Sequence, residues 1–216
     1  MDAISQRKAM VDQQIARRGV RDGAVLAAMG CVPREEFVPA SLIEAAYQDG
    51  PLPIGHGQTI SQPYIVALMA QAAQILPGDR ILEIGTGSGY SAAILAQLGK
   101  EVFTVERIPP LALEAEERFK KLGYLNVHAK VDDGTLGWPE KGPFDAIVVT
   151  AGAPVVPETL LQQLVEGGRI VIPVGDQFSQ ELLRLTKKDQ TFTREILEYV
   201  RFVPLIGKAG WHDAGR

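Results

Sequence analysis

The feature that most constrains the fold is a buried apolar segment that runs directly into a glycine-rich turn. Residues 80–84 predict a buried strand, and Gly85, Gly87 and Gly89 interrupt it, while the apolar run 92–96 predicts a helix immediately afterwards. Such a turn leaves free backbone N–H groups and bare glycine surface at the carboxyl end of a strand, where open α/β sheets bind nucleotides. The alternative is a tight turn that binds nothing, but one glycine suffices for a turn and this segment has three.

Acidic residues near the glycines narrow the class of ligand. The spacing is G-x-G-x-G, whereas dinucleotide folds usually show G-x-G-x-x-G. Glu106 ends the next apolar strand, about 20 residues on, where a carboxylate can accept hydrogen bonds from ribose hydroxyls. NAD and S-adenosylmethionine both carry such a ribose. Only S-adenosylmethionine also carries an ammonium group, which gives Glu83, two residues before the first glycine, a partner.

The composition of the chain is that of an ordinary globular protein. Its 216 residues suit one α/β domain with an appended segment, and 46% hydrophobic and 22% charged residues are typical values. The net charge of -4 shows no excess of basic residues, so we expect no nucleic-acid partner. The single cysteine, Cys31, rules out an internal disulfide and fits a reducing compartment. Residues 1–8 lack a signal-peptide core and no apolar run approaches transmembrane length, so we expect a cytoplasmic protein with no membrane partner.

The first part of the chain predicts helices followed by a loop. Apolar residues near helical spacing predict a helix over 4–18, which Gly19 ends. Asp22 can cap a second helix that runs through residue 29. Residues 32–39 form a proline-bounded connector. The Gly- and Pro-rich residues 49–58 predict an irregular loop that lies over a site.

From residue 59 onward, helices and strands alternate regularly. The pattern predicts helices over 62–76, 90–98, 110–122 and 157–165, and strands over 80–84, 102–105, 126–130, 144–149 and 169–174. Two final apolar stretches, 182–185 and 196–203, predict paired strands. This rhythm predicts an α/β fold with a doubly wound, mostly parallel sheet and helices on both faces. We expect a single domain with N-terminal helices and a covering loop over 1–60, a cofactor-binding core over 61–175, and C-terminal strands and a tail over 176–216.

Two further acids follow the third predicted strand. Asp132 and Asp133 precede Gly134, and the ends of neighbouring strands converge on one crevice, so these acids could reach the adenine whose ribose Glu106 holds. An Asp-Gly pair is also a common turn in any protein. The small residues 150–153 after the next strand leave room for a ligand beside the cofactor, or form a plain loop.

The segment that opens the helix before the glycine turn contains Ser61. Pro63 suits a first helical turn, and Ser61 or the residue after it lies near the cap, so the residues alone favour capping as the role of Ser61. The histidines at 56, 128 and 212 lack the spacing of metal ligands and of a Ser-His-acid triad. We therefore predict no metal site.

Several motifs outside the glycine turn point to one family. They are Gln58-Thr59-Ile60-Ser61-Gln62-Pro63, Asp133-Gly134, Pro154-Val155-Val156-Pro157, Gly167-Gly168-Arg169, Pro173-Val174-Gly175 and Val200-Arg201-Phe202-Val203-Pro204-Leu205. With these segments the sequence resembles the protein-L-isoaspartate O-methyltransferases over nearly its whole length. The resemblance implies the Rossmann-like sheet of S-adenosylmethionine-dependent methyltransferases, with an N-terminal helical segment and C-terminal antiparallel strands.

The resemblance also implies an activity. Members of this family transfer a methyl group from S-adenosylmethionine to the free carboxylate of L-isoaspartyl residues in damaged proteins and peptides. The methyl ester then cyclises to a succinimide, which can reopen as normal aspartate. The implied partners are isoaspartyl-containing proteins and peptides. The sequence leaves the oligomeric state open, with a monomer slightly favoured.

Roles for individual residues follow from their positions in the family pattern. Ser61 matches the active-site serine. The residues implied for cofactor binding are Gln58, Thr59, Glu83, Gly85, Thr86, Gly87, Ser88, Gly89, Glu106, Arg107, Asp132, Asp133, Gly134 and Thr150. The residues implied for substrate binding are Ile60, Ser61, Tyr64, Ala151 and Val203. The chain departs from the pattern at Asp132, where many members have glycine, and at Tyr64, where some have histidine.

Three other functions could use a similar sheet. A nicotinamide-dependent oxidoreductase predicts G-x-G-x-x-G and an acid/base residue for hydride transfer, and neither is apparent. A non-catalytic binding module would tolerate degraded motifs, yet Glu83, Glu106 and the glycines are all present. A methyltransferase that acts on a small molecule or on another carboxylate is excluded least well, because the cofactor-binding half looks alike in all of them.

Overall fold

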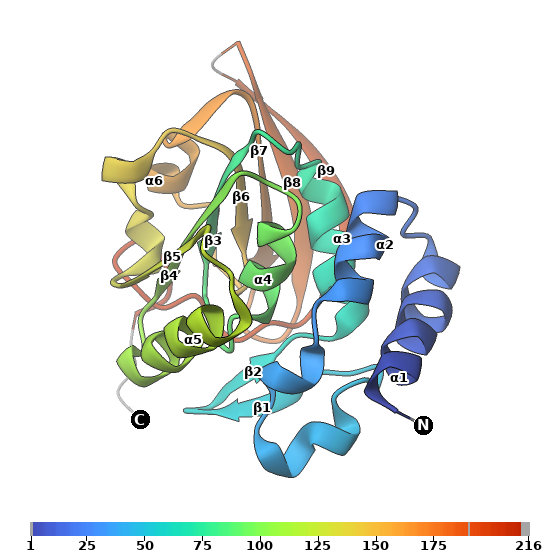
Figure 1. The fold of residues 1–216 in the computed structure, drawn as a ribbon. Coiled ribbons are helices and arrows are strands. Elements are labelled where there is room, and N and C mark those ends of the chain that lie inside the picture. The colour runs from blue at the N-terminus through green and yellow to red at the C-terminus, as the bar shows by residue number, and fades with distance from the viewer. Residues whose placement is uncertain (1, 190, 213–216) are drawn as a thin grey trace.

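A seven-stranded sheet forms the centre of the protein (Figure 1). The computed structural model describes residues 2–189 and 191–212, so residues 213–216 of the predicted tail lie outside the described residues. In spatial order the strands are β5 (Val127–Val131), β4 (Glu101–Glu106), β3 (Arg80–Ile84), β6 (Phe144–Val149), β7 (Leu164–Gly175), β8 (Gln180–Lys188) and β9 (Thr191–Val200). Neighbours from β5 to β7 pair in parallel, and β7, β8 and β9 pair antiparallel. The predicted fold class is confirmed.

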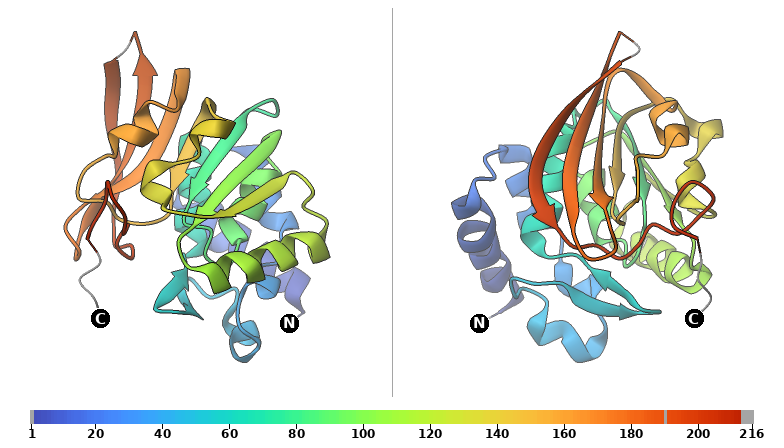
Figure 2. Two further views of the ribbon diagram at one scale, coloured as in Figure 1. Left: turned by 90° about the vertical axis from the view of Figure 1, so that its left-hand side faces the viewer. Right: turned by 180° about the vertical axis from the view of Figure 1, so that it is seen from behind.

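Successive residues of a strand point to opposite faces of the sheet, and apolar side chains are buried on both faces. Ile81 and Val102 belong to an apolar cluster with α2 (Gly23–Cys31), α3 (Pro63–Ala73), α4 (Tyr90–Ala96) and α5 (Pro109–Leu122). Leu82 and Phe103 belong to a second cluster with α6 (Glu158–Leu161). Figure 2 shows the N-terminal helices and α6 on opposite sides of the sheet. No helix in the described part of the chain combines the length and the apolar character needed to cross a bilayer.

The N-terminal residues form helical turns that pack beside α3 (Figure 1). These elements are α1 (Ala3–Ala9), a π-helical turn (Met10–Ile15), and the 3-10 turns η2 (Ala16–Arg18), η3 (Arg34–Phe37) and η4 (Ala40–Ala45). Gly19, with a φ of 101°, ends the first helical stretch as predicted. The Asp22 carboxylate accepts hydrogen bonds from the backbone N–H groups of Ala24 at 2.8 Å and Val25 at 3.1 Å, so it caps α2 as predicted.

The prediction of an irregular loop over residues 49–58 is wrong. This segment contains a hairpin of β1 (Leu52–Gly55) and β2 (Gln58–Ile60). The two residues between the strands, His56 and Gly57, have φ angles of 51° and 69°. Two consecutive positive φ angles are typical of a type I′ hairpin turn, whose twist matches that of the paired strands. The usual pairs in such a turn are Asn-Gly, Asp-Gly and Gly-Gly, so the His-Gly pair did not indicate it.

The prediction of a helix over 157–165 is also wrong in its length. The helix α6 ends at Leu161, and β7 already begins at Leu164, which pairs with Phe144. The side chain of Gln163 donates to the backbone carbonyl of Leu136 at 2.9 Å and accepts from the backbone N–H of Trp138 at 2.8 Å. Contacts with residues distant in sequence therefore end this helix early.

Candidate active site

The glycine-rich turn joins β3 to α4, and its conformation requires glycine. Gly85, Gly87 and Gly89 have φ angles of 95°, 52° and 90°, in the left-handed region that side chains disfavour. A Cβ atom on Gly85 would lie 2.4 Å from the Thr150 hydroxyl, and one on Gly89 would lie 2.8 Å from the Phe119 ring. The turn is therefore fixed both by its backbone angles and by close packing.

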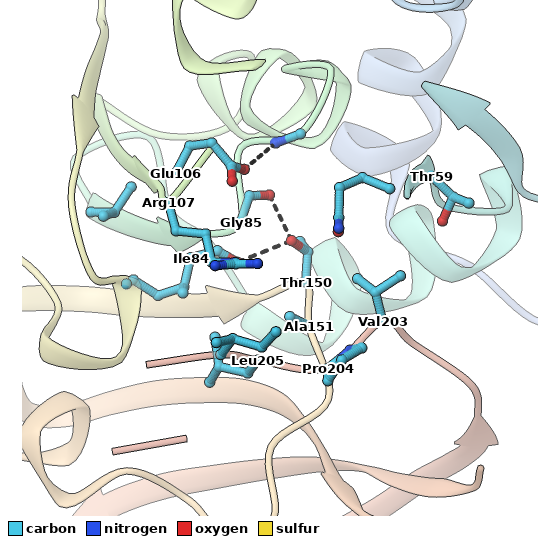
Figure 3. A pocket seen from close by; sticks show the side chains of 15 residues that line it. Thr59, Ile84, Gly85, Glu106, Arg107, Thr150, Ala151, Val203, Pro204 and Leu205 are labelled. Carbon is cyan, nitrogen blue, oxygen red and sulfur yellow. Dashed lines mark hydrogen bonds between the residues drawn. The ribbon is translucent and has the colours of Figure 1, made fainter. Parts of the chain in front are cut away.

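A cavity of about 550 Å³ lies beside this turn (Figure 3). It is lined by residues from the sequence-predicted cofactor set, namely Gln58, Thr59, Gly85, Gly87, Glu106, Arg107, Gly134 and Thr150. Ala151 and Val203, predicted for substrate binding, also line it. Five further lining residues were not assigned a role from the sequence, namely Ile84, Val105, Pro204, Leu205 and Ile206. The structure thus brings together segments from separate parts of the chain.

Glu106 holds the glycine-rich turn at the end of β4. One carboxylate oxygen accepts the backbone N–H of Gly87 at 2.9 Å, and the other accepts the backbone N–H of Ile108 at 3.0 Å. The residue is only 6% exposed, and the surface that it keeps lines the cavity (Figure 3). Each oxygen of a carboxylate has a second acceptor position, so Glu106 can still accept hydrogen bonds from a ligand.

Glu83 lies beneath the turn and is fully buried, away from the lining of the cavity. The Thr104 hydroxyl donates to Glu83 Oε2 at 2.6 Å, and the hydroxyls of Thr104 and Thr86 are 2.6 Å apart. Burial raises the pKa of Glu83 to about 7, against the opposing influence of the Ser91 and Thr104 hydroxyls. The hydroxyl groups of Thr104 and Thr86 therefore connect the Glu83 carboxyl to the glycine-rich turn by hydrogen bonds.

Asp132 and Asp133 lie near the cavity, but their carboxylates face other groups. Asp133 accepts hydrogen bonds from the backbone N–H of Thr135 at 2.9 Å and of Lys208 at 2.8 Å. The Asp132 carboxylate contacts the Lys130 ammonium at 2.6 Å, and this bond holds the pKa of Asp132 below its usual range. Only Gly134 of this predicted group lines the cavity. The turn alternative raised from the sequence describes Asp133 well, because it caps the 3-10 turn η5 (Gly134–Leu136).

The C-terminal segment closes one side of the cavity. The backbone N–H of Gly152 donates to the Val203 carbonyl at 2.8 Å, and the N–H of Leu205 donates to the Gly152 carbonyl at 2.8 Å. The Trp211 indole N–H also donates to that Gly152 carbonyl, at 3.0 Å. These bonds fix Pro204 and its neighbours over the ends of the parallel strands (Figure 3).

Ser61 borders two further cavities next to the first. One, of about 420 Å³, joins Ser61 and the predicted residues Ile60, Thr86 and Ser88. The other, of about 670 Å³, joins Ser61 to the end of β9 and the residues that follow it, 199–203. Thr59 and Thr150 line all three cavities, so the cavities adjoin.

The capping role that the residues alone favoured for Ser61 is wrong. The N-cap of α3 is Gln62, and its side chain donates to Asp49 at 2.7 Å instead of capping the helix. The Ser61 side chain is therefore not committed to the helix end. Tyr64 is 7% exposed and lines none of the three cavities, and the Arg18 guanidinium lies 3.6 Å from its ring centroid. In the described residues no group of three or more histidine, cysteine or acidic side chains could hold a metal ion.

Comparisons with known proteins give a consistent result. A family described as protein-L-isoaspartate(D-aspartate) O-methyltransferase (PCMT) matches residues 5–210. The chain is 56% identical over 206 residues to a protein-L-isoaspartate O-methyltransferase of Geobacter metallireducens, covering 95% of both chains. It is 58% identical over 206 residues to the protein of the same name in Trichlorobacter lovleyi, again covering 95% of both.

Two solved structures share the fold, with sequence identities of 32% and 30%. A structure named protein-L-isoaspartate O-methyltransferase is 32% identical, with a TM-score of 0.86 over 94% of this chain and 67% of that chain. A Plasmodium falciparum structure described as a beta-aspartate methyltransferase in complex with S-adenosyl-L-homocysteine is 30% identical. Its TM-score is 0.81, over 93% of this chain and 98% of that chain.

Proposed function

The chain belongs to the protein-L-isoaspartate(D-aspartate) O-methyltransferase family, and on this premise we propose roles for the residues that line its cavities. It transfers a methyl group from S-adenosylmethionine to the free carboxylate of L-isoaspartyl residues in damaged proteins and peptides. The ester so formed starts their repair through a succinimide. The family, activity and methyl donor expected from the sequence are therefore confirmed.

The residues of the first cavity fit S-adenosylmethionine. Gly85 and Gly87 line this cavity without side chains, and Glu106 offers acceptor positions for two ribose hydroxyls. Gly134 and Ile84 also line this cavity, and they pack closely, since a Cβ atom on Gly134 would lie 2.6 Å from Ile84 Cγ2. When bound, S-adenosylmethionine supplies a methyl group that its sulfonium sulfur has already activated.

We propose that Ser61 binds the substrate carboxylate. It lines both the cavity of about 420 Å³, which residues of the glycine-rich turn also line, and the cavity of about 670 Å³ that opens toward β9, and this shared position is the observation that carries the proposal. Its hydroxyl can donate a hydrogen bond to one carboxylate oxygen and leave the other oxygen free to attack the methyl carbon. Residues 199–203 then provide the surface against which the rest of the peptide lies.

The proposed reaction needs no general base. A carboxylate is ionised at neutral pH and is itself the nucleophile, so no proton has to be removed before it attacks. The protein must hold the carboxylate oxygen in line with the methyl carbon and keep water away. Ser61 serves the first purpose, and the residues 203–206 that cover the cavity serve the second.

The setting of the enzyme is a separate proposal. We propose that it works in the cytoplasm and acts as a monomer on isoaspartyl proteins and peptides. The single cysteine, which fits a reducing compartment, supports this setting.

Replacement of Ser61 tests the proposal. Because the Ser61 side chain does not cap α3, Ser61→Ala should leave the unfolding temperature nearly unchanged while it lowers turnover of an isoaspartyl peptide by about tenfold or more. Ser61→Asp should be less active still, because its charge repels the incoming carboxylate. The exposed Ser41, replaced by alanine, is the matched control. Wild-type methylation by the Ser61→Asp variant would contradict the assignment.

A further inference from the structure

Arg34 is a fully buried arginine that contacts the main chain of Ser61. Its Nε donates to the Ala46 carbonyl at 2.8 Å, and its Nη2 donates to the Ser61 carbonyl at 2.8 Å. The guanidinium carbon lies 4.8 Å from the centroid of the Tyr90 ring, within the range of a cation–π contact. Its third nitrogen, Nη1, has no hydrogen-bond partner among the described residues.

The charge of Arg34 is not balanced by an acid. The described residues place no carboxylate in an ion pair with it, although two acids follow it directly in the sequence. Glu35 instead pairs with Arg7 at 3.2 Å, and Glu36 pairs with Lys121 at 2.6 Å. Arginine remains charged even when buried, and a buried charge without an acidic partner costs several kcal/mol. A neutral side chain would fill this space at lower cost.

The contact with Ser61 explains what the buried charge achieves. Ser61 lies in the two-residue connection between β2 and α3, so neither a sheet ladder nor the helix fixes its main chain. A hydrogen bond from a charged donor is roughly twice as strong as one between neutral groups. Arg34 also ties this connection to Ala46 and to Tyr90 of α4, which follows the glycine-rich turn.

We propose that Arg34 is a positioning residue for methyl transfer, which fixes the Ser61 main chain so that the Ser61 hydroxyl faces the cavity shared with the glycine-rich turn. The inference rests on the proposed role of Ser61 in holding the substrate carboxylate. It does not involve the methyl donor directly, because Arg34 lines none of the three cavities.

The first test compares Arg34→Gln and Arg34→Lys with the wild-type enzyme. Arg34→Gln should lower kcat/KM for an isoaspartyl peptide about 10- to 100-fold, the range for one hydrogen bond to a charged group. Arg34→Lys should be intermediate, since an ammonium keeps the charge but cannot donate to both carbonyls in the same fork. The Kd of S-adenosylhomocysteine, measured by calorimetry, should stay within about twofold in both variants. Should Arg34→Gln fail to fold, Arg34→Lys carries the same comparison.

A matched control separates positioning from general stability. Arg169 also bonds to carbonyls of α3, donating to Ala73 at 2.9 Å and to Gln74, but at the other end of the helix from Ser61. Arg169→Gln should lower the unfolding temperature while kcat/KM at a permissive temperature stays near the wild-type value. An equal loss of kcat/KM in Arg169→Gln and Arg34→Gln, at equal loss of stability, would overturn the proposal.

A double-mutant cycle shows whether Arg34 acts through Ser61. If it does, Arg34→Gln should cost less than about twofold in kcat/KM when Ser61→Ala is already present. A full additional loss in that background would overturn the positioning role, even with Ser61 essential. A Ser61→Ala enzyme with wild-type activity would instead contradict the assigned role of Ser61, so the two failures give different results.

Discussion

Glu83 gives the fold a pH dependence that one substitution should remove. Burial raises its pKa in the folded state from 4.5 to about 7, and the nearby carboxylate of Glu106 adds to the shift. Below pH 4.5 the carboxyl is protonated in both the folded and the unfolded chain, so its contribution to stability is fully present there. As the pH rises, the unfolded chain loses its proton first, and the folded state is progressively destabilised until Glu83 itself ionises near pH 7.

The size of the effect follows from the shift. Because one pKa unit corresponds to about 1.4 kcal/mol, the free energy of unfolding of the ligand-free chain should lose about 3 kcal/mol to this group between about pH 4.5 and about pH 8. Glu83→Gln cannot titrate and should lose none of it. The difference in unfolding free energy between Glu83→Gln and wild type should therefore change by about 3 kcal/mol, in favour of the variant, across this range.

Urea denaturation of the two proteins at both pH values measures this difference. Taking the change with pH cancels any fixed cost of the substitution, including the loss or gain of a hydrogen bond with Thr104. It also cancels the titration of groups that are common to both proteins. If the two curves of unfolding free energy against pH run parallel, the buried carboxyl does not titrate as argued, and the chain of hydroxyls from Glu83 to Thr86 carries no proton-linked energy.

Two further substitutions test the walls of the first cavity. Glu106→Ala should weaken binding of S-adenosylhomocysteine by about 1.5–3 kcal/mol, the range for hydrogen bonds to a charged group, and Glu106→Gln should weaken it less. If calorimetry finds the same affinity in both variants and in the wild type, Glu106 does not bind the ligand. Asp133→Ala removes acceptors for the Thr135 and Lys208 N–H groups, so we expect about 1–2 kcal/mol less stability in urea and faster proteolysis after Lys208. If cleavage after Lys208 is no faster in Asp133→Ala than in the wild type, the proposed role of this contact is contradicted.

The parts of the fold that local sequence determines were predicted well. The strand 80–84 and the strand 144–149 have the same bounds in the structure as in the sequence pattern. The bounds of α6 were wrong because Gln163 bonds to Leu136, and the hairpin turn at His56 was missed because its backbone angles have no local signature. A distant contact thus accounts for the error in α6, whereas the error at the hairpin lies in the turn itself.

The site residues also divide into those that local structure positions and those that distant contacts position. Glu106 was placed correctly at the cavity because the end of a parallel strand fixes both its position and its direction. An acid that follows a strand by one or two residues has no such constraint, and Asp133 turns to a backbone N–H 75 residues away. Spacing encodes where the strand ends, but it does not encode the direction of a side chain in the turn that follows.

The same contact explains why the C-terminal wall of the cavity was difficult to foresee. Asp133 holds the Lys208 N–H, and Gly152 holds both Leu205 and Trp211, so the segment 203–206 is fixed by partners from two other strand ends. Apart from the Asp133 carboxylate and the Trp211 indole, these bonds use backbone groups, which any residue can supply. The cavity that we propose for the methyl donor is therefore complete only when this segment packs across the ends of the parallel strands. Its formation is coupled to the packing of the whole sheet rather than to the glycine-rich turn alone.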